Sequence, residues 1–150
     1  MDKFDVRPDN NVAPGPLVAV APLPRSLRVL VVEDNPDALD LVCEMLCAFG
    51  HQVQAAAHGE AARGMLATTP FDVLLTDVSL PGMSGIELAR AAVREWPGLK
   101  IIFASGHGDA LTRHLDYAAA SLQKPYELGQ LAALLDAIGR QKPAGANVRQ

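Results

Sequence analysis

The chain has 150 residues, a length typical of one domain, and 49% of them are hydrophobic, which suffices for a substantial core. The 13 basic and 17 acidic residues give a formal charge of −4, and no basic block indicates nucleic-acid binding. No apolar run approaches the roughly 20 residues that a membrane span needs, and Asp2, Asp5 and the prolines after them argue against a secretory signal. We therefore expect one domain, located in the cytoplasm.

The first 25 residues are rich in proline. Five of the 11 prolines lie here: Pro8, Pro14, Pro16, Pro22 and Pro24. Proline lacks the amide donor and blocks helix interiors, so we expect residues 1–25 to be a flexible arm or part of a linker between domains. Residues 141–150 are expected to form a disordered tail, which leaves residues 26–140 as the folded domain.

Apolar runs and helical patterns alternate through that domain. Strands are expected at 27–32, 52–56, 72–76, 100–104 and 121–123, and helices at 36–49, 58–67, 84–96, 110–117 and 127–140. Val73, Leu74 and Leu75 form a continuous apolar run, which is typical of a strand buried on both faces of a parallel sheet. Strands that alternate with helices in this way predict a doubly wound α/β domain.

The helix expected at 36–49 carries two apolar strips. The strip expected to face the core comprises Leu39, Val42, Cys43, Leu46 and Phe49. A second strip comprises Ala38, Leu41, Met45 and Ala48, and it either widens the core face or forms a docking surface. Cys43 and Cys47 are expected to pack rather than to bind metal or sense redox state, because free cysteine is among the most buried residue types.

Polar residues stand where several expected strands end. Glu33 and Asp34 follow the first strand, Asp77 ends the third, Ser105 the fourth and Lys124 the fifth. The carboxyl ends of parallel strands lie along one edge of a sheet, which is where open α/β sheets place their chemistry. Asp77 alone would fit a loop-capping role equally well. Three acids, a hydroxyl and a lysine at one edge favour a functional site.

These segments resemble the receiver domain of two-component response regulators. The matching segments, in the order found in the family, are Val31–Asn35, Asp77 with Leu80–Gly85, Ser105–Gly106 and Lys124–Pro125. Each segment is weak by itself, whereas four in order are highly specific. The resemblance covers residues 26–140 and implies a flavodoxin-like fold, with a five-stranded parallel sheet of strand order 2-1-3-4-5.

The resemblance also implies a reaction, in which Asp77 accepts a phosphoryl group from a phosphohistidine. Mg²⁺ is the implied cofactor, with Asp34, Asp77 and the backbone carbonyl of Ser79 as ligands and Glu33 acting through a bound water. Lys124, before a cis bond to Pro125, is expected to pair with Asp77 and then with the phosphoryl oxygens. Ser105 is expected to hydrogen-bond the phosphoryl group.

The match departs from the family at two places. Receivers usually carry Phe or Tyr three residues before the lysine, where this chain has Ser121, so the usual readout of phosphorylation is in doubt. The segment from Ser105 to Lys124 is also short, so the helix expected at 110–117 is expected to be stunted or irregular. His107 either tunes dephosphorylation or is a surface residue, whereas His51, His58 and His114 are expected at the surface.

The expected partner is a histidine kinase or a histidine phosphotransfer protein, with the chain a monomer or weak dimer. A stand-alone regulator, a terminal receiver of a hybrid kinase that acts as phosphate sink or relay, and an unphosphorylated adaptor all stay open. A phosphatase would need an Asp at Ser79, two residues beyond the nucleophile. A dinucleotide-binding module would need a G-x-G-x-x-G motif after the first strand, which is absent.

Overall fold

The computed structural model describes residues 26–106 and 115–141. The strands are β1 (Arg28–Val32), β2 (Gln52–Ala56), β3 (Val73–Asp77), β4 (Lys100–Ser105) and β5 (Ala120–Gln123). The helices are α1 (Pro36–Ala48), α2 (Gly59–Thr68), α3 (Gly85–Glu95) and α4 (Leu128–Gln141). The predictions for the arm at 1–25, for His107 and His114, and for the tail beyond 141 lie outside the described residues.

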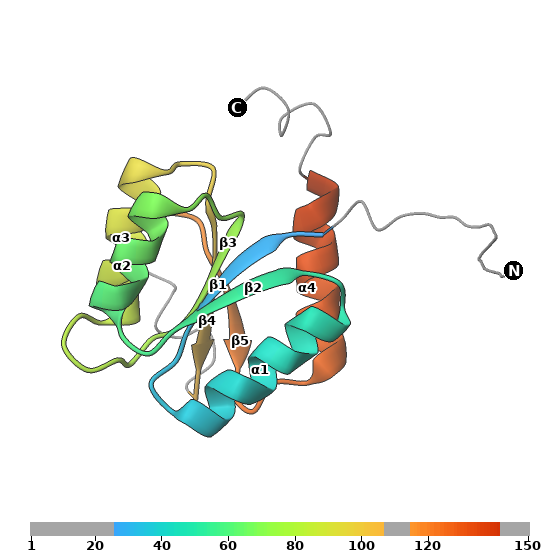
Figure 1. Ribbon diagram of the computed structural model, residues 1–150. Coiled ribbons are helices and arrows are strands. Elements are labelled where there is room, and N and C mark those ends of the chain that lie inside the picture. The colour runs from blue at the N-terminus through green and yellow to red at the C-terminus, as the bar shows by residue number, and fades with distance from the viewer. Residues whose placement is uncertain (1–25, 107–114, 142–150) are drawn as a thin grey trace, which may run out of the picture.

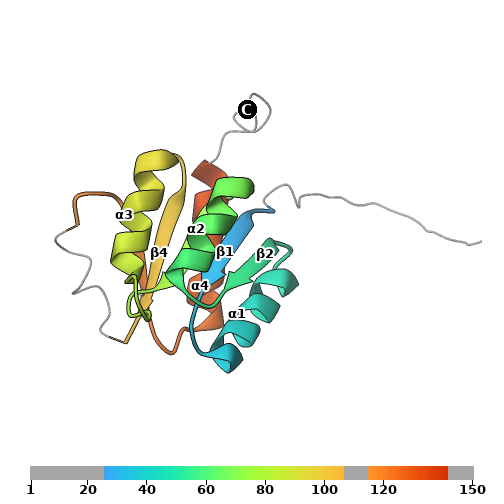
Figure 2. The same ribbon diagram turned by 60° about the vertical axis from the view of Figure 1, so that its left-hand side comes forward.

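The five strands form one parallel sheet in the order β2-β1-β3-β4-β5, which confirms the predicted fold. Helices α1 and α4 cover one face of the sheet, and α2 and α3 cover the other (Figure 1, Figure 2). Side chains of a strand alternate between the faces, so Val29 and Val31 of β1 pack under α1 while Leu30 and Val32 pack under α2. The central strands β1, β3 and β4 are therefore buried on both faces.

Helix ends near the functional edge are fixed by local sequence. The side chain of Asn35 caps α1 by accepting a hydrogen bond from the amide of Ala38, at 3.0 Å. Ser84 and Glu87 form the predicted capping box at the start of α3. Both caps set the helices directly beyond the carboxyl ends of β1 and β3.

In α1 the packing prediction is wrong for one cysteine, and the second apolar strip falls between the two alternatives left open for it. Cys43 packs against the core, whereas Cys47 is exposed, so the expected packing role is wrong for Cys47. The second apolar strip is also divided, because Met45 packs against the core while Leu41 is 59% exposed. Helix α1 contacts the sheet on one side only, so residues on its other side stay exposed. This is why the strip contains both packed and exposed residues.

The segment before β5 is not helical where the structure describes it. Leu115–Tyr117 is irregular, so the predicted helix does not reach Tyr117. The Tyr117 hydroxyl instead donates a hydrogen bond to the carbonyl oxygen of Ile86, at 3.0 Å, and the Arg90 guanidinium lies 5.8 Å from the centre of the tyrosine ring. These contacts hold the segment against α3.

Among the residues that the structure describes, no helix has the length and apolar character that crossing a membrane requires.

Candidate functional site

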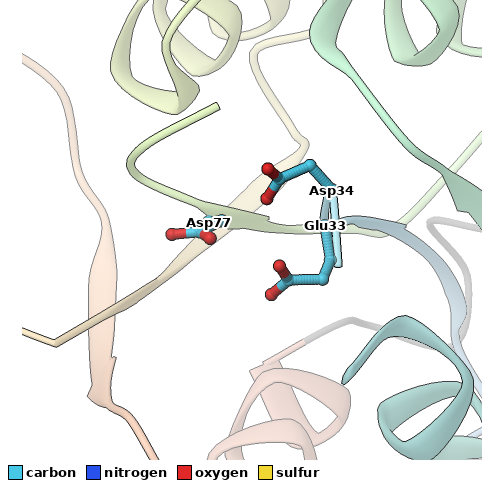
Figure 3. Close-up of side chains that lie close together, drawn as sticks. All are labelled: Glu33, Asp34 and Asp77. Atoms are coloured by element: carbon cyan, nitrogen blue, oxygen red, sulfur yellow. The ribbon is translucent and has the colours of Figure 1, made fainter. Parts of the chain in front are cut away.

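Three carboxylates meet at the carboxyl edge of the sheet. Glu33 and Asp34 follow β1, and Asp77 is the last residue of the neighbouring strand β3 (Figure 3). One oxygen from each side chain lies within 4.8 Å of the others, close enough for a single cation to contact all three. The sheet therefore brings together the three acids that the sequence placed at two separate strand ends.

Glu33 is the buried member of this cluster, with only 4% of its surface exposed. Its Oε1 accepts a hydrogen bond from Lys124 Nζ at 2.7 Å, and its Oε2 accepts one from the amide of Asn35 at 3.1 Å. A buried carboxylate needs such partners, because its ionised form is costly to desolvate. Both oxygens of Glu33 are thus engaged by the protein.

Lys124 also reaches the central acid of the cluster. Its Nζ lies 3.0 Å from Oδ2 of Asp77, so one ammonium group bridges Glu33 and Asp77. Burial lowers the pKa of Lys124, but hydrogen bonds and charge attraction from these two carboxylates outweigh it and raise that pKa overall. Lys124 is therefore charged at neutral pH, and its bond to Pro125 is cis, as the resemblance implied.

Asp34 and Asp77 differ from Glu33 in exposure. Asp34 is exposed, and no described residue donates a hydrogen bond to its carboxylate. Asp77 is half-buried, and its Oδ1 accepts a hydrogen bond of 3.3 Å from the amide of Ser79. These two carboxylates face the open side of the cluster, where oxygen donors of this kind suit a hard divalent cation such as Mg²⁺.

The two predicted serines, Ser105 with its hydroxyl and Ser79 with its backbone carbonyl, lie on the same edge. Ser105 ends β4, which pairs with β3, and only 3% of its surface is exposed. Its carbonyl oxygen accepts the amide of Lys124 at 2.8 Å, which ties the end of β4 to the lysine. Ser79 lies in the exposed loop two residues beyond Asp77.

The sequence alone did not single out two residues that shape this site. Gly85 begins α3 so close to β3 that a Cβ atom there would lie 2.0 Å from the carbonyl oxygen of Asp77. Tyr126 packs against the core beside the lysine, and its burial raises the pKa of its hydroxyl. Gly85 lies within the segment Leu80–Gly85 that resembles the family. The close approach of α3 to β3 explains why a glycine is needed at this position.

Comparison with known proteins gives the same family from both sequence and structure. The sequence model of the family named response regulator receiver domain matches residues 29–136 of this chain. The chain is 38% identical over 107 residues to the response regulator receiver protein CpdR of Brucella abortus, covering 69% of this chain and 89% of that protein. It is 49% identical over 65 residues to the virulence sensor protein BvgS of Bordetella pertussis, covering 43% of this chain and 5% of that protein.

Solved structures agree in fold. A response regulator receiver domain protein from Clostridium thermocellum superposes with a TM-score of 0.69 at 26% identity, covering 77% of this chain and 95% of that one. The receiver domain of the sensor histidine kinase PA1611 from Pseudomonas aeruginosa, with a magnesium ion in its active-site cleft, gives 0.65 at 25% identity, covering 77% and 98%. With its sheet order, its edge of acids and this family match, the chain belongs to the response regulator receiver domains.

Proposed function

We propose that this chain is a phospho-accepting receiver of a two-component or phosphorelay system, and that Asp77 takes the phosphoryl group from a phosphohistidine. The observation that carries the proposal is the convergence of Glu33, Asp34 and Asp77 with Lys124 at one edge of the sheet. A carboxylate can serve as the nucleophile when nearby cations offset the charge of the incoming phosphoryl group. The chain would act as a regulatory domain rather than an enzyme, in the cytoplasm, as a monomer or weak dimer.

Mg²⁺ is the proposed cofactor, held by Asp34, by Asp77 and by the backbone carbonyl of Ser79. Glu33 would act through a bound water, since Lys124 and the amide of Asn35 already occupy its two oxygens. The PA1611 receiver, with its coordinated magnesium ion, supports the choice of metal by analogy. When bound, the ion supplies the positive charge that two meeting anions require.

The roles of the other two residues follow from their positions. Lys124 would hold Asp77 in the free protein and contact a phosphoryl oxygen afterwards. Its ammonium has three donors, and among the described residues its partners are Glu33 and Asp77. Ser105 ends the strand next to Asp77 and would offer its hydroxyl to the phosphoryl group.

Acetyl phosphate with Mg²⁺ provides a test that needs no partner protein. Intact-mass spectrometry should detect one added phosphoryl group on the wild-type chain and none on Asp77→Asn. Asp34→Ala should need much more Mg²⁺ for the same labelling, because it removes one of two direct carboxylate ligands. Asp40→Asn, an exposed acid on α1, is the matched control and should label normally. Undiminished labelling of Asp77→Asn would refute the assignment, because the phosphoryl group would then lie on another residue. No labelling of the wild-type chain would leave the unphosphorylated adaptor.

The partner that supplies the phosphoryl group is proposed to be a histidine kinase or histidine phosphotransfer protein that docks on α1. The strip at Ala38, Leu41 and Met45 lies beside the site, and Leu41 is its freely exposed member. An exposed leucine at the rim of a reaction site is suited to bury against a partner helix.

Leu41→Asp should slow phosphotransfer from the kinase and leave labelling by acetyl phosphate unchanged. The reason is that a charge placed in an apolar contact opposes docking without touching the acids of the site. The matched control is Ala137→Asp, at an exposed position of α4, which should transfer at the wild-type rate. Radiolabel transfer from the phosphorylated kinase measures the transfer rate of both variants. If Leu41→Asp lost labelling equally with the kinase and with acetyl phosphate, the substitution would have damaged the fold.

A second candidate function is a phosphate sink or relay within a hybrid kinase. This function is favoured by the 49% identity to a segment of the sensor protein BvgS. That segment makes up 5% of BvgS. A relay should return its phosphoryl group to a histidine phosphotransfer protein quickly, whereas an output receiver should retain it. The rate of back-transfer from phosphorylated Asp77 distinguishes the two.

A further inference from the structure

A groove of about 270 Å³ lies at the edge of the sheet opposite the acids. It is formed where α2 ends and where β3 and β4 begin, and it is lined by Leu66, Ala67, Thr68, Thr69, Pro70, Phe71, Trp96 and Leu99. Phe71 and Trp96 are both only half-buried, so two aromatic rings are available to a ligand. The lining holds no charged side chain, which indicates an uncharged, apolar occupant.

The start of β1 lies beside one wall of this groove. The amide of Arg28 donates to Oδ2 of Asp72 at 2.8 Å, the amide of Asp72 donates to the carbonyl of Arg28 at 2.8 Å, and Nη1 of Arg28 lies 3.4 Å from the carbonyl oxygen of Pro70. In the parallel register Val29 is opposite Val73. Arg28 is thus the residue at the start of β1 that contacts the groove lining, through the carbonyl oxygen of Pro70.

The entry of the chain at this point is fixed. The hydroxyl of Ser26 donates to the carbonyl of Gly50 at 2.9 Å, and the amide of Leu27 donates to Nδ1 of His51 at 3.0 Å. Ser26 is two residues before Arg28, whose side chain contacts Pro70, so the sequence before Ser26 is joined to the described chain close to the groove. Tethering raises the effective concentration of a segment at a nearby site to the millimolar range without any new contact.

The sequence before Ser26 has the chemistry of a groove ligand. Residues 10–24 contain no charged side chain, whereas solvated linkers are usually rich in polar and charged residues. Pro22 and Pro24 fix their own backbone angles and bias Ala21 and Leu23 toward the polyproline II conformation. Aromatic-lined grooves bind such proline-rich segments because little conformational entropy is lost.

We propose that residues 17–24 of this chain bind in the groove between Phe71 and Trp96 of the same molecule. A polyproline II segment rises about 3.1 Å per residue, so the four residues from 21 to 24 span roughly 12 Å, more than twice one strand spacing. The segment would cover the half-buried rings of Phe71 and Trp96 and leave the acidic edge open. The inference does not depend on phosphorylation of Asp77.

Trp96 makes the proposal directly testable, because it is the only tryptophan of the chain. In the full chain, Leu23→Asp should shift the Trp96 emission to longer wavelength and increase its quenching by acrylamide, since a carboxylate cannot be buried in the apolar groove. Val12→Asp is the matched control, outside the proposed segment, and should behave as wild type. Ala67→Glu, at an exposed lining position, should reproduce the effect of Leu23→Asp from the groove side.

Adding a synthetic peptide of residues 11–25 to the Leu23→Asp chain should restore the wild-type emission in a saturable manner. Identical quenching of Trp96 in wild type and Leu23→Asp would overturn the proposal and leave the groove for another occupant. A wild-type emission that changes on dilution would mean that a second copy supplies the segment, which also contradicts binding within one molecule. Far-UV circular dichroism verifies that each variant is folded.

Discussion

Lys124 is the residue on which the charge balance of the site depends. Three carboxylates gather at the edge of the sheet, and this ammonium is the cation that the structure places between two of them. Glu33 is almost fully buried, so the loss of its cation leaves this carboxylate with the amide of Asn35 as its donor among the described residues. Removing one partner of a buried pair is destabilising because the other stays desolvated.

Lys124→Met should lower the free energy of unfolding by about 2 kcal/mol without Mg²⁺, the usual cost of leaving a buried acceptor without its partner. The same variant should bind Mg²⁺ more tightly, by up to about tenfold, because a cation that competes for Asp77 is gone. Urea unfolding and calorimetric titration with Mg²⁺ measure the two effects.

Lys100→Met is the matched control for that substitution. Lys100 is an exposed lysine at the start of β4, at the far end of the strand from the acids. Its replacement should change neither the stability nor the Mg²⁺ affinity appreciably. Weaker Mg²⁺ binding by Lys124→Met would mean that the lysine organises the acids for the metal rather than competing with it.

Gly85 is the residue that allows α3 to start directly against β3. A Cβ atom there would lie 2.0 Å from the carbonyl oxygen of Asp77, so the helix or the strand would have to move. Gly85→Ala should therefore cost about 2 kcal/mol of stability, as overpacking does, and should slow labelling of Asp77 by displacing it. Urea unfolding and labelling by acetyl phosphate check both parts.

The comparison for Gly85→Ala is Gly64→Ala in α2, where an added Cβ would meet no atom within 4 Å. Alanine is the better helix former, so this variant should gain roughly 0.5–1 kcal/mol and label normally. If both variants behaved alike, close packing at Gly85 would not be what positions Asp77.

At the scale of elements, one histidine ties the first strand to the turn after α1. Nδ1 of His51 accepts the amide of Leu27, the imidazole lies edge-on to Phe49, and Gln52 continues from it into β2. Burial lowers the pKa of His51, because a charged ring is poorly solvated there. The surface position expected from sequence is thus replaced by a half-buried structural role.

The free energy of unfolding should fall as the pH is lowered below about 6.5, the ordinary pKa of histidine in an unfolded chain. His51 resists the proton in the folded state, so the unfolded state binds more protons in this window and is favoured as pH decreases. Above pH 6.5 the contribution is fully present. Urea unfolding at several values between about pH 7.5 and 5.5 gives the free energy of unfolding as a function of pH. The fall of this free energy with decreasing pH should be less steep for His51→Gln than for wild type. Equal slopes would assign the pH dependence to other groups.

At the scale of the whole molecule, we predict that the coupling between the acidic edge and the region of β5 and α4 is altered. Ser121 stands in β5 opposite Phe103, where the family usually has an aromatic ring. The nearest aromatic in this segment, Tyr117, is engaged on α3 through its hydroxyl and through Arg90, which also lies 3.6 Å from Asp116. A ligand shifts a conformational equilibrium only by its differential affinity for the two states, and no ring at 121 contributes to that difference.

Beryllofluoride with Mg²⁺ should therefore change the amide NMR shifts near Ser105 and leave those of β5 and α4 largely unaffected. Burying an aromatic ring is worth roughly 1.5–3 kcal/mol, and that driving force is missing at Ser121. Ser121→Tyr should restore part of the response in β5 and α4. Large shift changes through residues 117–123 and into α4 of the wild-type chain would contradict this prediction.

Much of the architecture was predictable because its signals are local. The continuous apolar runs indicated strands buried on both faces, and Asn35 and Ser84 marked helix starts that the structure confirms. The carboxyl ends of parallel strands must share an edge, so acids at two strand ends and a lysine at a third were expected to meet. Glu33, Asp77 and Lys124 do meet, through contacts of 2.7 and 3.0 Å.

The sequence by itself thus determined the order of elements, the family and the residues along the acidic edge, because periodicity, caps and strand-end positions depend on neighbours in the chain. Only the tertiary structure decided that Cys47 is exposed, that Leu115–Tyr117 is irregular, and that Gly85 touches Asp77. Each of these depends on which face of one element meets another. That choice is made by contacts between distant segments, such as Tyr117 with Ile86, which local patterns do not encode.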